Sequence, residues 1–201
     1  AMTTEPPRGF SFDPERDVLL DAHTIRGLAH PLRVKMLGLL RVNGPATATQ
    51  LAVQLGQSTG ATCYHLRQLA AYGFVVEDTS RGGGRERWWR SAHRSTHFDA
   101  ASAEPEVAAA GEVYLRAIVR SYADRMDTWL AEAPTVDILW RRAADMSDVV
   151  LELTPHETRQ LTAELAELLE KYQHRAQPPD GTEQVAVQYQ VLPLLAGGAT
   201  S

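Results

Sequence analysis

The sequence predicts a mainly α-helical chain with one β-hairpin, followed by a long helix and a small α+β module. Apolar residues recur at three- and four-residue steps over residues 21–42 and 46–73, as on the buried faces of helices. Two short runs of strand formers, 74–77 and 87–90, enclose a glycine-rich segment and predict a hairpin. A second helical pattern covers 104–131. Four helices and a hairpin in this order predict a winged helix-turn-helix domain.

We divide the chain at the points where this pattern begins and ends. Residues 1–20 are rich in prolines and charges and are expected to be a mostly disordered lead-in. The winged helix-turn-helix domain is expected over residues 21–98. Residues 99–201 are expected to hold a dimerisation helix and the α+β module.

Turn and capping residues delimit the helices of the winged domain. We expect these helices at about 21–29, 31–42, 46–55 and 58–73. Pro31 fits the first turn of the second helix, and Asn43-Gly44-Pro45 ends that helix. Ser58 is a natural N-cap, and Gly73 suits the left-handed conformation that closes a helix.

The region after Asp99 is acidic and largely helical in pattern. Its long helix carries an apolar stripe that is too long for such a small domain to cover alone, and that a partner subunit could cover. The stripe consists of Val107, Gly111, Tyr114, Ile118, Tyr122, Met126 and Trp129. The α+β module is expected to contain a strand at 149–153, a helix from Pro155 to His174 with Thr154 as N-cap, and a strand at 184–192.

Charge is distributed very unevenly along the chain. Residues 22–98 hold ten Arg or Lys and three acidic residues, a net charge of +7. The remainder holds ten basic and twenty-two acidic residues, a net charge of −12, so the chain as a whole carries −5. A locally basic segment in an acidic chain indicates a polyanionic partner, here double-stranded DNA.

The composition also indicates where the protein works. No segment approaches the ~20 uncharged apolar residues that span a bilayer, and the start of the chain has acids and prolines in place of a signal peptide. Cys63 is the only cysteine, which excludes an intrachain disulfide and a thiolate-rich metal site. We expect a cytoplasmic protein with no membrane partner.

The fourth helix is the expected reading helix of the helix-turn-helix, the one that enters the major groove. At ~100° per residue, Thr62, Leu66 and Leu69 fall on one side, and their character marks that side as the core. The opposite, DNA-facing side carries Gly60, Cys63, Tyr64, Arg67 and Gln68. Ser58 and Thr59 at the positive end of the helix suit a phosphate, and Arg81, Arg85 and Arg87 of the wing suit the backbone or minor groove.

Three stretches of this sequence resemble the ArsR-type winged-helix regulators of bacteria. They are AHPLRVKMLGLL at 29–40, LAVQLGQSTGATCYHLRQLAAYGFV at 51–75 and RGGGRERWW at 81–89, and the likeness extends over about residues 21–98. The resemblance implies a homodimeric repressor that releases DNA when a metal or a small effector binds. The Cys-x-Cys motif of the metal-sensing members is absent from 46–56, and the helix at 104–131 has no histidine.

We therefore predict no metal site and no cofactor. His93 and His97 stand four residues apart and would ligate zinc only if that segment were helical, so we interpret them as linker residues. His65 is interpreted as a packed, hydrogen-bonded histidine rather than a base reader. A small organic effector is the remaining possibility for a signal, with Tyr114, Trp129, Trp140 and Tyr189 either lining an apolar pocket or belonging to the core.

DNA binding has two alternatives, a protein-interaction module and an enzyme. The winged helix can serve as a scaffold for a protein-interaction module that binds no DNA and uses the acidic C-terminal half. An enzyme is not expected, because the sequence has no phosphate-binding glycine loop and no nucleophile elbow. No catalytic residue is predicted.

Overall fold

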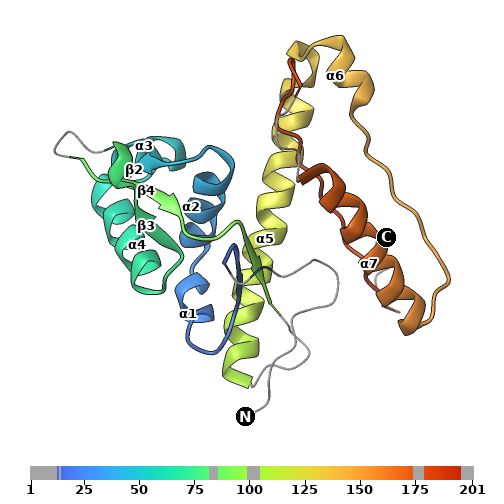
Figure 1. The fold of residues 1–201 in the computed structure, drawn as a ribbon, viewed down its shortest axis with the longest axis horizontal. Coiled ribbons are helices and arrows are strands. Elements are labelled where there is room, and N and C mark those ends of the chain that lie inside the picture. The colour runs from blue at the N-terminus through green and yellow to red at the C-terminus, as the bar shows by residue number, and fades with distance from the viewer. Residues whose placement is uncertain (1–12, 14, 82–85, 99–104, 174–178, 196–201) are drawn as a thin grey trace. The chain divides into compact units, whose positions relative to one another are not determined.

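The computed structural model describes residues 13, 15–81, 86–98, 105–173 and 179–195 (Figure 1). Among these, the residues up to Val136 form one compact unit and those from Asp137 form a second. In the described part of the chain, no helix is long and apolar enough to cross a membrane.

Four helices of the first unit form the predicted helix-turn-helix core (Figure 1). They are α1 (Ile25–Leu28), α2 (Pro31–Val42), α3 (Ala48–Leu55) and α4 (Thr59–Ala71). The first helix begins later than expected, because the carboxylate of Asp21 accepts hydrogen bonds from the backbone N–H groups of His23 and Thr24 and holds 21–24 in a turn. Helix α2 is capped by His30, whose Nδ1 accepts from the N–H of Leu32 at 3.2 Å.

Helices α3 and α4 are fixed relative to each other by local signals in the sequence. Thr47 and Gln50 form a capping box at the start of α3, and Gly56 ends it with a φ of 61°. The Ser58 hydroxyl caps α4 by accepting from the N–H of Ala61, as predicted. The fully buried Thr62 hydroxyl lies 2.9 Å from the carbonyl of Ala48, so that one hydrogen bond joins the two helices.

The predicted hairpin is present and gains a third strand. Strands β3 (Val75–Glu77) and β4 (Trp88–Ser91) pair antiparallel, and β2 (Ala46–Thr47) pairs with the other edge of β4. A short 3-10 turn, η1 (Thr79–Arg81), follows β3. The tip of the wing, residues 82–85, lies outside the described residues and includes Arg85.

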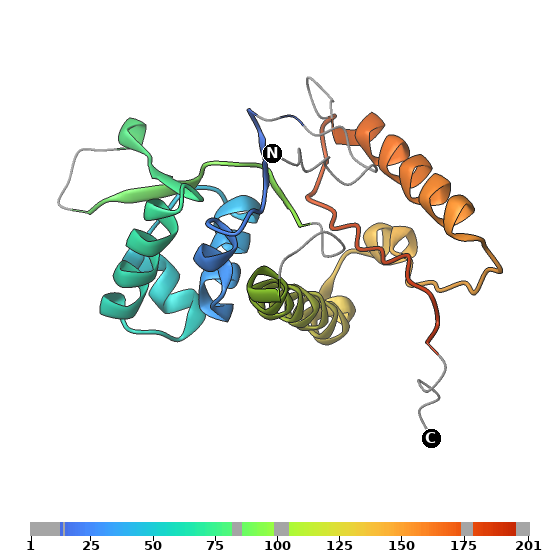
Figure 2. The same cartoon turned by 90° about the horizontal axis from the view of Figure 1, so that it is seen from below.

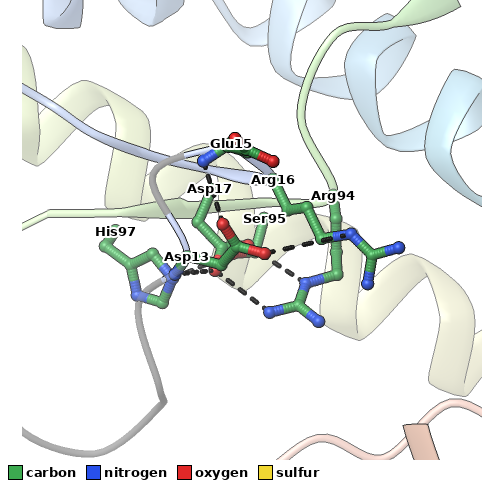
Figure 3. A network of polar contacts seen from close by, with 7 residues as sticks. All are labelled: Asp13, Glu15, Arg16, Asp17, Arg94, Ser95 and His97. Carbon is green, nitrogen blue, oxygen red and sulfur yellow. Dashed lines mark hydrogen bonds and ion pairs between the residues drawn. The ribbon is translucent and has the colours of Figure 1, made fainter. Parts of the chain in front are cut away.

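A second, two-stranded sheet ties the start of the chain to the end of the winged domain. Strand β1 (Asp17–Leu19) pairs in parallel with β5 (Ser95–His97). The carboxylate of Asp17 is fully buried and accepts from Arg94 Nε at 3.1 Å, Arg94 Nη2 at 3.0 Å and Ser95 Oγ at 2.7 Å (Figure 3). The prediction of a disordered lead-in through residue 20 is therefore wrong for residues 17–19.

The long helix α5 (Pro105–Glu132) belongs to the first unit, together with the short turn η2 (Ala133–Thr135). It packs on α1 and α2 (Figure 2), where Tyr114 and Ala117 join the core residues of the helix-turn-helix. At Gly111 the helix passes so close to Phe98 that a Cβ would lie 2.1 Å from its ring. The boundary predicted at residue 99 is thus not a boundary between compact units.

This packing corrects the expectation that a partner subunit covers the stripe of α5 that contains Gly111, Tyr114 and Ile118. In the structure, α1 and α2 of the same chain contact α5, and Tyr114 is buried while Ile118 packs against the core. Of the predicted stripe, Met126 remains exposed, together with four apolar residues of α5 outside it, Val113, Leu115, Val119 and Leu130.

The second unit holds two helices, α6 (Ile138–Ala143) and α7 (Pro155–Gln173). Thr154 caps α7 as predicted, and the Glu157 carboxylate accepts in return from the Thr154 N–H. Residues 149–153 and 184–192, predicted as strands, are not β-strands within the described chain. The prediction of an α+β module is therefore wrong for the single chain. Most apolar residues of the two segments are exposed to solvent, and the segments do not pair as strands.

Candidate nucleic-acid interface

Helix α4 has one buried and one solvent-facing side, divided as the helical period predicts. Thr62, Leu66 and Leu69 are fully buried. On the other side Gly60, Tyr64 and Arg67 are exposed, and Cys63 and Gln68 are half-buried. Ser58 and Thr59 are exposed at the N-terminal end of the helix. The residues predicted to face DNA on α4 are therefore brought together on one accessible surface.

An open depression of about 310 Å³ lies beside this surface, between α4, the start of α3 and the wing. Thr59, Cys63 and Arg67 line it from α4, and Arg87 and Trp89 line it from the wing. The depression thus places two arginines from distant parts of the sequence at one site. Four further residues line the depression and were not predicted from the sequence: Thr47, Ala48, Thr49 and Glu86.

Glu86 gives this depression a mixed charge. Its carboxylate accepts a hydrogen bond from the Thr49 hydroxyl at 3.1 Å and so connects the wing to α3. Arg87 contacts Glu77 at 3.9 Å, but their side chains are 70% and 46% exposed. An ion pair of that exposure is worth less than about 1 kcal/mol, so the Arg87 guanidinium can exchange Glu77 for a phosphate at small cost.

Several of the basic side chains that make up the local charge of +7 pair with other residues of the same chain. Arg94 pairs with Asp17, and Lys35 pairs with Asp124 of α5 at 2.7 Å. Arg41 donates to the carbonyl of His93 and to the Thr96 hydroxyl, and burial lowers the pKa of its guanidinium. The sum of charges in the sequence therefore overstates the charge that reaches the candidate interface.

Arg81 is the third predicted cation of the wing. It contacts Asp78 at 3.7 Å, and its guanidinium lies 5.3 Å from the ring centre of Trp88. The two contacts hold Arg81 beside β4 at the base of the wing. Its side chain is still 53% exposed, so it remains available to a phosphate.

His65 lies on the structural side of α4, as expected. Its ring lies against that of His30, tilted by 40° with 4.4 Å between centroids, and its Nδ1 is buried with no hydrogen-bond partner in the described structure. The expected hydrogen bond to this nitrogen is therefore not found. Burial, together with the nearby His30 and Arg33, lowers the pKa of His65, so the ring is neutral at pH 7.

The linker expected around His93 and His97 is present at His93 only. His97 lies in β5, where its Nε2 is 2.8 Å from the Ser95 hydroxyl, and His93 lies between β4 and β5. The segment is not helical, so the spacing of these histidines does not produce a zinc site. Across the described residues, no cluster of three or more His, Cys, Asp or Glu side chains is placed to hold a metal ion.

The aromatic residues proposed for an effector pocket are divided between the two units. Tyr114 is buried in the core of the first unit, where burial raises its pKa to about 12, and Trp129 is half-buried on α5. Trp140 and Tyr189 are half-buried in the second unit. Tyr114 is therefore a core residue, and the effector site of the other three remains a prediction.

Comparison with known proteins agrees with this geometry. Residues 28–78, from the end of α1 to the end of β3, match the family model described as "Helix-turn-helix domain". No protein among the curated sequences matches the chain.

Three solved structures are similar to parts of the chain, each with a TM-score of 0.32. One is the homodimeric winged helix-turn-helix DNA-binding domain of Mb0332 from Mycobacterium bovis, a possible ArsR-family transcriptional regulator. It shares 24% identity over 51% of this chain and 77% of that chain. Rv0081 of M. tuberculosis shares 24% over 52% and 91%, and ZitR of Lactococcus lactis in apo form shares 15% over 72% and 83%.

The family match and the observed architecture identify the same part of the chain. Helices α2 to α4 lie within the matched residues, and the β2-β4-β3 sheet adds the wing. Residues 28–78 are a helix-turn-helix domain, and the first unit of this chain is a winged helix built around it.

Proposed function

We propose that this protein is a homodimeric, sequence-specific DNA-binding repressor that inserts α4 into the major groove. The accessible face of α4 is the observation that carries the proposal. It offers a glycine, an aromatic ring, a guanidinium and an amide, at Gly60, Tyr64, Arg67 and Gln68, on the side opposite the buried residues. This combination suits the reading of base edges, because Arg pairs with guanine and Gln with adenine.

The residues around α4 suit the DNA backbone. Ser58 and Thr59 stand at the N-terminal end of a 13-residue helix, where the helix dipole and free N–H groups favour a phosphate. Arg81, Arg85 and Arg87 of the wing are proposed to contact the adjacent backbone or minor groove. Such contacts position the protein without reading sequence.

A second copy is proposed to pack against the exposed side of α5. Leu115, Val119, Met126 and Leu130 are 40–63% exposed and fall within about 60° of each other around the helix axis. An apolar stripe of this kind on a long helix is typical of a helix-to-helix subunit interface. A two-fold dimer would present two α4 helices to an inverted repeat.

Release of DNA by a small organic effector is the second part of the proposal. Trp140 and Tyr189 of the second unit remain candidate lining residues, and each is half-buried. A thermal-shift screen with apolar ligands and metals tests this part. Stabilisation of the dimer by one ligand class, with loss of DNA binding, is expected for an effector, and stabilisation by none would remove this part.

The DNA-binding proposal is tested on a duplex selected by the wild-type protein from a random library. Arg67→Ala should weaken binding of the selected duplex by about tenfold or more, since a good bidentate base contact is worth about 1–3 kcal/mol. Binding of random DNA should change much less. Arg159→Ala, which removes an equal charge from exposed α7, is the control and should leave both affinities unchanged.

Two results would contradict the proposal. If Arg67→Ala and Arg159→Ala bind the selected duplex equally well, α4 is not the reading helix. If the wild-type protein selects and binds no duplex even at low salt, the winged helix serves as a protein-interaction scaffold instead. Low salt is the decisive condition, because phosphate contacts strengthen binding steeply as salt falls.

A further inference from the structure

Glu86 is the only acidic residue among the described residues that line the depression beside α4. It lies two residues before β4, and its carboxylate accepts from the Thr49 hydroxyl at 3.1 Å. The register of β2 with β4 explains this contact, because Ala46 pairs with Trp89. If that register is continued by three residues, Thr49 and Glu86 stand opposite each other. The start of α3 therefore holds the carboxylate in the depression.

The charge of Glu86 is not neutralised within the described part of the chain. No Lys or Arg there forms an ion pair with it, and Arg87, the next residue, pairs with Glu77 instead. Its hydrogen-bond partner, the Thr49 hydroxyl, carries no charge. The depression thus holds an unpaired carboxylate together with the guanidinium groups of Arg67 and Arg87.

The depression lies beside the reading face of α4, which consists of Gly60, Tyr64, Arg67 and Gln68, and not at its centre. At ~100° per residue, Cys63 lies roughly 60° to one side of Gly60 and lines the depression. Tyr64 and Gln68 lie roughly 40–80° to the other side. Arg67 is only about 20° from Gly60, so it belongs to both the reading face and the depression.

Insertion of α4 into the major groove brings this side of the helix against the DNA backbone. A helix with its side chains is about 10–12 Å across and the major groove is about 12 Å wide, so the sides of an inserted helix lie along the phosphates. If Gly60, Tyr64 and Gln68 meet base edges, one strand of phosphates passes the depression. Glu86 then faces a row of groups of its own charge.

We propose that Glu86 raises the sequence specificity of the protein by repulsion. At the right sequence, Arg67 pairs with a base, and the base contacts of α4 keep the phosphates away from the carboxylate. At any other sequence, Arg67 has no base partner and draws a phosphate into the depression, beside Glu86. The cost falls on the wrong sequences, which is how a repulsive element increases specificity. This inference rests on the proposed DNA binding and adds a residue that weakens it selectively.

Glu86→Gln tests the repulsion, because glutamine keeps the size of the side chain and an oxygen that accepts from Thr49 but carries no charge. Removing one negative charge about 5 Å from a phosphate in water is worth about fourfold in affinity. At about 10 mM salt, the variant should bind random duplex about fourfold more tightly than wild type, and the selected duplex less than about twofold more tightly, in a fluorescence anisotropy titration. The gain should shrink at about 0.15 M salt, where the screening length is about 8 Å.

Two further variants separate the position of the charge from its removal. Glu167→Gln removes an equal charge from an exposed position on α7 and should leave both affinities unchanged. Thr49→Val keeps the charge but removes the hydroxyl that holds the carboxylate, and the exposed position of Thr49 spares the core. It should show part of the same gain on random duplex. Added to Glu86→Gln it should change nothing more, because Thr49 acts only through Glu86.

The outcomes separate this inference from the proposed function. If Glu86→Gln binds random duplex no more tightly than wild type at low salt, or loses affinity for the selected duplex, the repulsion is overturned. The proposed function then still stands on the duplex that wild type selects. If wild type selects no duplex, the repressor is overturned, and binding of random duplex at low salt still decides the inference. A gain in Glu86→Gln supports it, and absence of binding by both proteins overturns it as well.

Discussion

The ion pair between Asp17 and Arg94 offers the sharpest test of how the winged domain is held together. The Asp17 carboxylate is fully buried and accepts from Arg94 through two hydrogen bonds, from Ser95 and from the N–H of Asp13. Arg94→Ala removes the charged partner and leaves a buried carboxylate with two neutral donors. Breaking a buried pair in this way costs about 3–5 kcal/mol. We expect about 3 kcal/mol, because the Arg94 side chain is 34% exposed and water can replace part of it.

The pH dependence of this loss has a definite sign. Hydrogen bonds and the charge of Arg94 outweigh burial and hold the pKa of Asp17 far below its usual range. The stability that this gives is fully present above the unfolded pKa of about 3.9 and is lost as pH falls through the folded pKa. In Arg94→Ala the carboxyl is still buried but has lost the charge that lowers its pKa, so it protonates at a higher pH.

Urea unfolding at pH 7 and pH 3, followed by circular dichroism, measures both effects. The difference in free energy of unfolding between wild type and Arg94→Ala should be about 3 kcal/mol at pH 7 and clearly smaller at pH 3. Arg116→Ala is the control, since its pair with Glu112 is 72% and 62% exposed and is worth no more than about 0.5 kcal/mol. A difference below 1 kcal/mol at pH 7, or one that does not change with pH, would refute this account of the network.

Three glycines and one threonine give further predictions. Thr62→Val should lower the free energy of urea unfolding by about 1 kcal/mol, because the fully buried hydroxyl that forms a hydrogen bond between α4 and α3 is lost. An unchanged free energy of unfolding would mean that this hydrogen bond contributes nothing. Gly27→Ala should lower the melting temperature and cost about 1–3 kcal/mol, since its Cβ would lie 2.7 Å from the ring of Phe74, and a raised melting temperature would contradict the packing. Gly60→Ala and Gly38→Ala both enter open space in a helix and should fold at least as stably as wild type. Only Gly60→Ala should weaken DNA binding in a fluorescence anisotropy titration, and equal affinities would remove Gly60 from the reading face.

Features decided within a few residues were predicted well from the sequence. The caps at Ser58 and Thr154 and the two sides of α4 follow from side chains and periods that lie inside one helix. Strand β1 was not predicted from the sequence, because Asp17 is stabilised by Arg94, which lies 77 residues further along the chain. No pattern in the neighbouring residues indicates that Asp17 is buried. The available charge was overestimated for the same reason, since the partner of Lys35 lies on α5.

The wrong predictions in the C-terminal region have a different cause. The patterns of 149–153 and 184–192 predict strands from side-chain character alone, but a strand exists only when another strand pairs with it. The sequence does not reveal that the helix predicted at 21–29 packs on α5. The apolar stripe of α5 was therefore predicted to face a partner subunit. Helix α1 in fact contacts both α4 and α5.

This position of α1 has a mechanical consequence. Helices α1 and α2 each contact α4 on one side and α5 on the other, and Tyr114 and Leu66 share one packed core. Packed cores shift between discrete arrangements rather than stretching, so a displacement of α5 should move α4 with it. In the proposed dimer, the long helix would therefore act as a lever fixed to the candidate DNA-binding surface, and whatever tilts it would set the spacing at which the two α4 helices meet the double helix.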